Sequence, residues 1–139
     1  MWRAFYTLAL LLAAPLALAR LWWRGIREPG YRRRIGERFG YYREDRVARP
    51  LLWVHAVSVG EARASAALAQ GLAAGFPGHG LLLTCTTAAG RETLQELHGD
   101  SAMIAWFPYD DPGSVRRFLA HFRPLYGLLV ETEIWPNLL

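Results

Sequence analysis

Four groups of polar residues follow apolar stretches of the chain at positions where chemistry could take place. They are Ser58 to Glu61, Thr86 to Arg91, Pro108 to Asp111, and Glu131 to Glu133. If the apolar stretches are strands of an open parallel sheet, each group comes directly after a strand. Ligands of such sheets bind in the crevice beyond the carboxyl ends of the strands. The sequence therefore predicts a ligand-binding edge built from these four groups.

Glu61, the last residue of the stretch HAVSVGE, has two possible roles. A general base needs a carboxylate close to the proton that it removes, in a partly dry crevice that raises its pKa toward neutrality. The stretch from Ser58 to Glu61 also fits a capping box, in which the Ser hydroxyl and the Glu carboxylate each accept a backbone N–H. Gly60 would let a substrate approach the backbone closely. The local pattern by itself favours the cap.

Glu131 and Glu133 directly follow the apolar run LYGLLV. A carboxylate that leaves a buried strand costs free energy unless it is paired, solvated or used. Two acids at this position suggest a functional site. The alternative is a solvated loop in which Glu133 begins the next helix.

The other two groups have capping alternatives. The stretch from Thr86 to Arg91 could bind an anion at a helix N-terminus, and capping by Thr87 is at least as well supported. Asp111 before Pro112 is typical of an N-cap, which is favoured over metal binding by Asp110 and Asp111. The sequence has no G-x-G-x-x-G or P-loop pattern, and its four His are scattered, so neither these nucleotide-binding loops nor a zinc site is supported.

Apolar runs alternate with helical patterns over residues 50–139. Strands are predicted at Leu51 to Val57, Leu81 to Thr86, Ala102 to Phe107 and Leu125 to Val130, with helices over about 61–74, 90–97 and 113–122 and another beginning in ETEIWPNLL. The strands are short and apolar on both faces, and their spacing requires crossover helices. A Rossmann-like α/β domain with a parallel sheet is therefore expected. Because the last helix is unfinished at residue 139, we expect the chain to be truncated.

The N-terminal segment predicts a membrane anchor. Ala4 to Ala19 carries no charge over sixteen residues, and Leu21 to Trp23 extends this stretch toward the roughly 20 residues that cross a bilayer. The small-x-small pattern of Ala17 to Ala19 would also fit a cleavable signal peptide. Ten Arg from Arg20 to Arg49 are expected to hold the following segment in the cytoplasm. They favour an uncleaved anchor over residues 1–23, which either spans the membrane or lies in it.

Charge is distributed unevenly along the chain. Residues 1–50 hold eleven Arg and four acidic residues, a balance of +7, whereas residues 51–139 hold five Arg and eight acidic residues, a balance of −3. This distribution suits a membrane-surface protein better than one that wraps nucleic acid. Residues 24–49 are predicted to be a basic juxtamembrane linker with a short helix. Cys85 is the single cysteine, so a reducing compartment without a disulfide framework is expected.

Six stretches taken together resemble the bacterial transferases of 3-deoxy-D-manno-octulosonic acid (Kdo). In chain order they are RLWWRG, YRRRIGERFGYY, HAVSVGE, TCTTAAGRE, FPYDDPGSVRRFL and VETEIWPNLL. The resemblance implies a membrane-anchored, metal-independent glycosyltransferase without a cofactor, built from two Rossmann-like domains in the GT-B arrangement. It implies transfer of Kdo from CMP-Kdo to a lipid A precursor. The N-terminal domain of this family handles the acceptor, and its C-terminal domain binds most of the donor.

The resemblance also assigns roles to individual residues. The general base of the family falls on Glu61, and a residue for transition-state stabilisation falls on Glu131. Further acceptor or lipid contacts are expected on the crevice and the basic segment, at Ser58, Gly60, Thr86, Thr87, Arg32, Arg33, Arg34 and Arg38. With the donor-binding domain missing, the fragment is predicted to be inactive alone. The alternative function is a non-catalytic, membrane-tethered module that binds anionic lipid.

Overall fold

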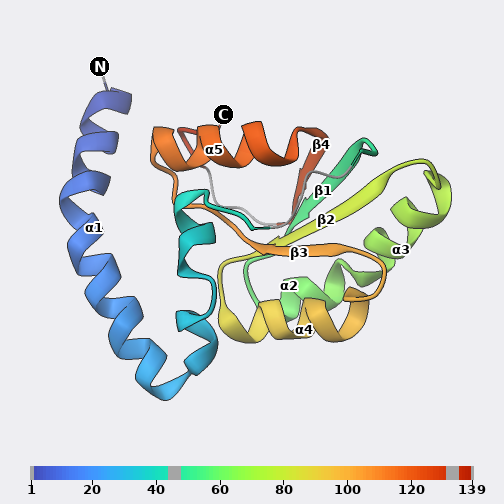
Figure 1. Cartoon of the computed structure of the whole chain (residues 1–139), viewed down its shortest axis with the longest axis horizontal. Helices are drawn as coiled ribbons and strands as arrows, with labels where there is room; N and C mark the ends of the chain where they lie inside the picture. The colour runs from blue at the N-terminus through green and yellow to red at the C-terminus, as the bar shows by residue number, and fades with distance from the viewer. Residues whose placement is uncertain (1, 44–47, 131–134, 139) are drawn as a thin grey trace.

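A parallel sheet lies between two helical layers, and a long N-terminal helix stands beside this body (Figure 1). The structure is a computed structural model that describes residues 2–43, 48–130 and 135–138. Its helices are α1 (Trp2–Arg27), α2 (Val59–Ala64), α3 (Ala66–Gly75), α4 (Ala88–His98), α5 (Pro112–Phe122) and the short 3-10 helices η1 (Pro29–Arg32) and η2 (Ile35–Phe39). Its strands are β1 (Leu51–His55), β2 (Gly80–Cys85), β3 (Met103–Trp106) and β4 (Pro124–Leu129).

The sheet has the order β3-β2-β1-β4, and its neighbouring strands are all parallel. β1 is central: Leu51 is opposite Gly80 of β2 on one side and Pro124 of β4 on the other. Each strand returns through a helix, as parallel pairing requires. The predicted parallel α/β fold is therefore confirmed.

Both faces of β1 are buried, which explains why its sequence is apolar without alternation. Leu52 and Val54 belong to a core formed with residues of α2, α3 and α4. Leu51 and Trp53 belong to a second core, formed mainly with Phe residues of α5 and the β3 side of the sheet. Two helical layers thus fix the strand ends relative to one another, and the strand ends carry the candidate site.

The helix predicted over residues 61–74 is in fact two helices. It begins at Val59, and Ser65 separates α2 from α3. The buried Ser65 hydroxyl donates to the carbonyl oxygen of Ala62 at 3.0 Å. Such a bond competes with the helical backbone ladder, which accounts for the break. Much of the helix predicted in ETEIWPNLL falls on residues 131–134, outside the described residues.

Residues 29–39 pack onto the folded body, which the linker prediction did not anticipate. Tyr31, Glu37 and Arg38 are buried. The ring of Tyr31 stacks on that of Trp106, with centroids 6.2 Å apart, and the Trp106 indole N–H donates to the carbonyl oxygen of Arg33 at 2.9 Å. Single aromatic and charged side chains, rather than an apolar stripe, hold this segment against the folded body. Its sequence therefore shows no hydrophobic period.

Gly40 is required at the end of η2. Its φ of 80° lies in the left-handed region, and an added Cβ would come within 2.7 Å of both Arg117 Cβ and the Ser114 carbonyl oxygen. Only glycine adopts this positive φ at low cost and also leaves room for the two α5 atoms. This residue thereby lets η2 approach α5 closely.

Helix α1 is long and apolar enough to cross a membrane over Phe5–Arg27, and only 6 % of this stretch is buried in the structure. It continues four residues past the predicted anchor. Its contacts with the body include a weak hydrogen bond between Thr7 and Asn137 at 3.4 Å and the packing of Leu21 against the cluster around Trp106. Such exposure is unlike that of a core helix and leaves an apolar surface available to lipid.

Candidate active site

The carboxyl ends of the strands point toward η1, η2 and α1 (Figure 1). The loops after β1 and β2 lie side by side at this edge because the Val57 carbonyl oxygen accepts three bonds. Its donors are the hydroxyls of Thr86 and Thr87, at 3.3 and 2.9 Å, and the thiol of Cys85, at 3.1 Å. The two predicted groups that begin at Ser58 and Thr86 are thus brought together.

Glu61 forms the predicted capping box at the start of α2. Its Oε2 accepts the backbone N–H of Ser58 at 2.5 Å and also the Ser58 hydroxyl, while the Ser58 hydroxyl oxygen lies 3.5 Å from the Glu61 backbone nitrogen. The side chain is half-buried, at the strand-end edge of the sheet. Cap and catalytic base are compatible at this position. An added Cβ at Gly60 would meet only Ser58 Oγ, at 3.7 Å, so the backbone here is open to approach.

Thr87 caps α4 by accepting the backbone N–H of Gly90 at 3.2 Å, as the capping alternative predicted. Gly90 itself is tightly enclosed, because an added Cβ would lie 2.4 Å from Cys85 Sγ and 3.2 Å from the carbonyl carbon of Ser58. The absence of a side chain at Gly90 therefore permits the close packing of the two loops.

Thr86 and Thr87 open onto a cavity of about 240 Å³ that also contains Arg20, Arg24 and Arg38. We call it the arginine cavity. Three arginines from α1 and η2 and two threonines line this cavity, and residues of these types are suited to a phosphate group. The sequence had indicated Arg38 but not Arg20 and Arg24. Their spacing of four residues, which places them on one face of a helix, was the available signal.

Arg38 is almost fully enclosed, at 4 % exposure. Its guanidinium donates to the Thr86 carbonyl oxygen at 2.9 Å and lies 3.9 Å from the Trp106 ring centroid. Burial lowers the pKa of Arg38 from its ordinary value, but a guanidinium remains charged at neutral pH. Its buried Nε has no hydrogen-bond partner in the described part of the chain. The side chain thus brings a fixed positive charge to the edge of the site.

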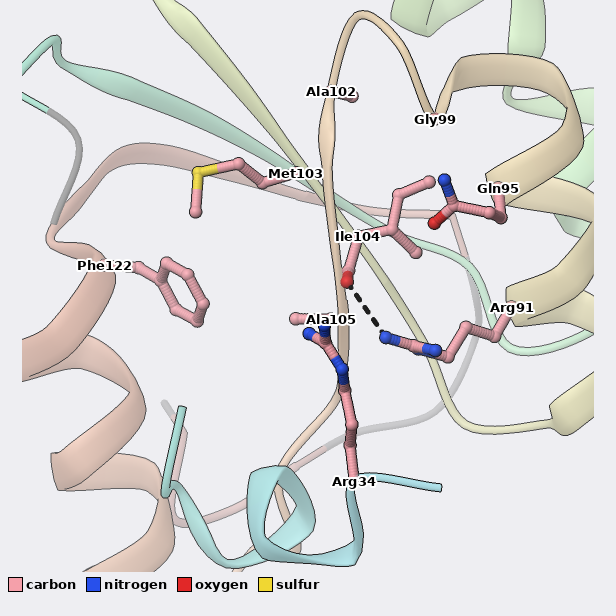
Figure 2. Close-up of a pocket in the computed structure, with 9 residues that line it drawn as sticks. All are labelled: Arg34, Arg91, Gln95, Gly99, Ala102, Met103, Ile104, Ala105 and Phe122. Atoms are coloured by element: carbon pink, nitrogen blue, oxygen red, sulfur yellow. Dashed lines mark hydrogen bonds between the residues drawn. The ribbon is translucent and has the colours of Figure 1, made fainter. Parts of the chain in front are cut away.

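The other predicted arginines lie elsewhere. Arg32 is the last residue of η1, from which its side chain reaches back to α1, donates to the Trp22 carbonyl oxygen at 3.0 Å and stacks over the Trp22 ring. Arg33 lines a small cavity beside Trp106. Figure 2 shows Arg34 beside β3, approaching Arg91, which donates to the Ile104 carbonyl oxygen at 3.2 Å. The structure therefore brings only Arg38 of this predicted set into the arginine cavity.

Glu37 is a buried acid that the sequence analysis did not single out. One of its carboxylate oxygens accepts the Trp106 backbone N–H at 2.9 Å and lies 3.8 Å from Arg91, while the other accepts from Arg34 at 3.1 Å. Its exposure is 1 %. It therefore attaches η2 to the end of β3 and so positions the neighbouring Arg38.

His55 ends β1 and is fully buried. Its Nδ1 lies 2.9 Å from the Thr84 hydroxyl, and its Nε2 has no hydrogen-bond partner among residues that the structure describes. Burial lowers the pKa of His55 to about 4, an effect opposed in part by the backbone of Thr84 and the charge of Glu61. The imidazole is therefore neutral at pH 7 and adds no positive charge at the carboxyl end of β1.

This burial predicts a specific pH dependence of stability. The unfolded chain binds a proton at His55 near pH 6.5 and the folded chain only near pH 4. The free energy of unfolding should therefore fall as the pH drops from 6.5 to 4, by up to about 3 kcal/mol from this residue. Urea unfolding at pH 7 and pH 4.5 measures it. His55→Gln should show a shallower decline than the wild type, and equal declines would contradict the assignment.

The structure describes the acidic residues that follow β3 but not those that follow β4. Asp111 caps α5 by accepting the backbone N–H groups of Gly113 and Ser114 at 3.0 and 2.9 Å, which confirms the capping prediction. Asp110 is buried, which raises its pKa, and it accepts the Asn137 N–H at 3.0 Å. No group of three or more potential metal ligands occurs within the described ranges. Glu131 lies outside the described residues.

Known proteins resemble this chain over most or all of its length. A sequence profile described as 3-deoxy-D-manno-octulosonic-acid transferase (kdotransferase) matches residues 33–139. The 3-deoxy-D-manno-octulosonic acid transferase of Bordetella pertussis is 46% identical over 149 residues, and that of Haemophilus influenzae is 36% identical over 140 residues. A probable mitochondrial 3-deoxy-D-manno-octulosonic acid transferase of Arabidopsis thaliana is 31% identical over 126 residues.

These matches cover different shares of the proteins compared. The two bacterial matches include 100% of this chain, and the plant match includes 91%. The chain spans about a third of the length of the bacterial relatives, at 34% and 33%, and 28% of the plant protein. The profile alone covers well over half of the chain. The chain therefore belongs to the 3-deoxy-D-manno-octulosonic acid transferase family.

Proposed function

We propose that this chain is the acceptor-binding part of a glycosyltransferase that transfers Kdo from CMP-Kdo to lipid IV(A), the lipid A precursor, in lipopolysaccharide synthesis. The observation that carries the proposal is the position of Glu61, at the start of α2 and next to the Thr86 loop that borders the arginine cavity. In the proposed GT-B arrangement, a second Rossmann-like domain supplies most of the CMP-Kdo site. Neither a metal nor a cofactor takes part.

In the proposed reaction, Glu61 acts as the general base. Its carboxylate removes the proton from a primary hydroxyl of the acceptor as that oxygen attacks the anomeric carbon of Kdo. The new carbon–oxygen bond forms while the bond to the CMP phosphate breaks. CMP leaves from the opposite face with the electron pair of that bond, so the anomeric centre inverts. Glu131 is proposed to stabilise the positive charge that develops on the sugar or to orient a neighbouring cationic group.

The arginine cavity is proposed to bind a phosphate of the acceptor. Arg20 and Arg24 lie in the last two turns of α1, and Arg38 holds its charge at the edge of the Thr86 loop. An anionic leaflet adds roughly 1 kcal/mol of attraction for each arginine near its surface. We therefore propose that the site lies on the cytoplasmic face of the bacterial inner membrane, with α1 as the anchor. Ser58 and Gly60 then border the reacting hydroxyl.

The test is a transfer assay in two settings. The 139-residue chain alone is expected to transfer no Kdo from CMP-Kdo to lipid IV(A), because these residues span only about a third of the length of the bacterial relatives and the proposed donor site lies outside them. The same chain, joined to the part of the Bordetella pertussis relative that it does not cover, is expected to transfer Kdo. The uncovered part alone is the control. Transfer by the 139 residues would overturn the proposed division, and a folded, CMP-Kdo-binding chimera without activity would overturn the function.

A further inference from the structure

A second cavity of about 310 Å³ lies between α1 and the folded body. Its wall on the α1 side consists of Leu10, Ala13, Ala14 and Ala17, and we call it the alanine cavity. These residues are spaced three or four apart, so they share one face of the helix. Because three of the four side chains are single methyl groups, the helix leaves this space unfilled.

The alanine cavity adjoins the arginine cavity. Ala17 and Tyr109 line both, so one ends where the other begins. Along the same face of α1, the lining changes from Leu10 and the alanines to Arg20 and Arg24. At 1.5 Å of rise per residue, the distance from Leu10 to Arg20 along the helix is about 15 Å. The paired cavities therefore present an apolar section and a cationic section, as a phosphorylated lipid requires.

Three of the polar side chains that line the alanine cavity are already engaged by the protein. Asp111 caps α5. Arg117 donates to the Phe39 carbonyl oxygen at 2.7 Å and to the Ser114 hydroxyl at 3.2 Å, and it stacks on the Tyr41 ring. With these bonds made, the alanine wall and the ring of Phe39 favour an apolar occupant over an ordered water, which needs several polar partners.

Another face of α1 indicates where such an occupant comes from. Phe5, Leu12 and Leu16 are exposed at 76%, 70% and 73%, and Trp23 at 71%. This apolar ridge is suited to contact with bilayer hydrocarbon. A lipid of the cytoplasmic leaflet would lie parallel to α1, with its phosphate near Arg20 and Arg24 and its chains directed toward the helix N-terminus. The alanine cavity is directly behind that helix.

We propose that the alanine cavity binds one acyl chain of the acceptor lipid whose phosphate occupies the arginine cavity. This inference rests on the proposed function and adds a specificity element to it. The acyl chain, held along α1, sets how far the sugar reaches toward Glu61. Acceptors without acyl chains would lose this positioning while keeping their phosphate contacts.

Photo-crosslinking in nanodiscs of phosphatidylethanolamine and phosphatidylglycerol tests the proposal on the intact 139-residue chain. The probe is a lipid IV(A) analogue with a diazirine at the end of one acyl chain. Cross-links are expected at the far wall of the cavity, on peptides that contain Phe39 or Tyr109. Cross-links confined to the outer face of α1, at residues such as Leu12 and Leu16, would overturn the proposal. The wild-type result decides this point without any variant.

A matched pair of variants measures the effect of filling the cavity. Ala14→Trp places an indole in the lining and is expected to lower cross-linking at Phe39 and Tyr109 at least fivefold. Ala9→Trp makes the same replacement at an exposed position of α1 outside this lining, and cross-linking should stay within twofold of the wild type. Equal cross-linking by both variants at the wild-type level would count against the acyl site.

Head-group binding separates this inference from the proposed function. The probe is the water-soluble, deacylated glucosamine disaccharide bisphosphate, measured by calorimetric titration. Arg24→Gln should weaken its binding about fivefold, and Ala14→Trp should leave it unchanged. If the bisphosphate does not bind the wild-type chain, the proposed acceptor site fails. If it binds while the acyl cross-links lie outside the cavity, the acyl site alone fails.

Discussion

Replacing Glu61 by Gln is expected to lower kcat for Kdo transfer about a thousandfold in the active chimera. Gln cannot accept the proton from the attacking hydroxyl, and general base catalysis contributes roughly 10²- to 10⁴-fold to a rate. Gln is also tolerated at this position of a capping box, where its amide oxygen accepts the Ser58 N–H that Glu61 now accepts at 2.5 Å. The variant therefore removes the base while largely retaining the cap. Steady-state transfer kinetics and urea unfolding measure the two effects separately.

The matched control for Glu61 is Glu96→Gln, which neutralises an exposed carboxylate on α4. Its transfer rate should stay within about twofold of the wild type. A near-normal rate for Glu61→Gln, with unchanged stability, would leave Glu61 with the capping role alone. Binding of anionic lipid should survive the Gln replacement whether or not the protein is an enzyme. Loss of transfer with retained lipid binding therefore favours the transferase over a lipid-binding module.

Replacing Glu37 by Ala is expected to destabilise the chain by about 2–3 kcal/mol. The change leaves the Trp106 backbone N–H without its acceptor and removes the anion that faces Arg34 and Arg91. A buried donor left without its acceptor costs roughly 1–3 kcal/mol, and the lost ion pairs add less because the Arg34 and Arg91 side chains are 46% and 18% exposed to solvent. Whole domains are stable by only about 5–15 kcal/mol, so the effect is large. Urea unfolding in detergent micelles measures it.

Two further variants calibrate the Glu37 result. Glu37→Gln keeps an oxygen for the Trp106 N–H and loses only the charge, so its cost should be smaller than that of Ala. Glu96→Ala removes an exposed acid and should change the free energy of unfolding by less than about 0.5 kcal/mol. If Glu37→Ala were as mild as Glu96→Ala, the buried contacts of Glu37 would not be what attaches η2 to β3.

The Glu37 effect bears on the site through the adjacent residue. Arg38 follows Glu37 in η2 and brings its guanidinium to the Thr86 carbonyl oxygen at 2.9 Å. Loss of the Glu37 contacts would release η2 and with it one wall of the arginine cavity. Binding of the deacylated bisphosphate should therefore weaken in Glu37→Ala, although Glu37 does not line that cavity.

The sequence by itself determined the strands, their parallel direction and the local caps. Leu51 to Val54 is apolar on both faces, and runs of this kind separated by helical patterns are compatible with few folds. The caps at Ser58, Thr87 and Asp111 were predictable because each depends on residues within three positions of the chain. Short-range hydrogen bonds leave a short-range signature.

The tertiary structure decided which charged groups meet at the site. Glu37 and Trp106 are 69 residues apart, and Arg38 and Thr86 are 48 apart. No periodicity in the sequence links such pairs. Burial in the folded chain also lowers the pKa of His55, and the local sequence around His55 gives no sign of this change. Desolvation and long-range pairing depend on the whole packed arrangement, so the arginine cavity and the alanine cavity became visible only after α1 and η2 were placed against the sheet.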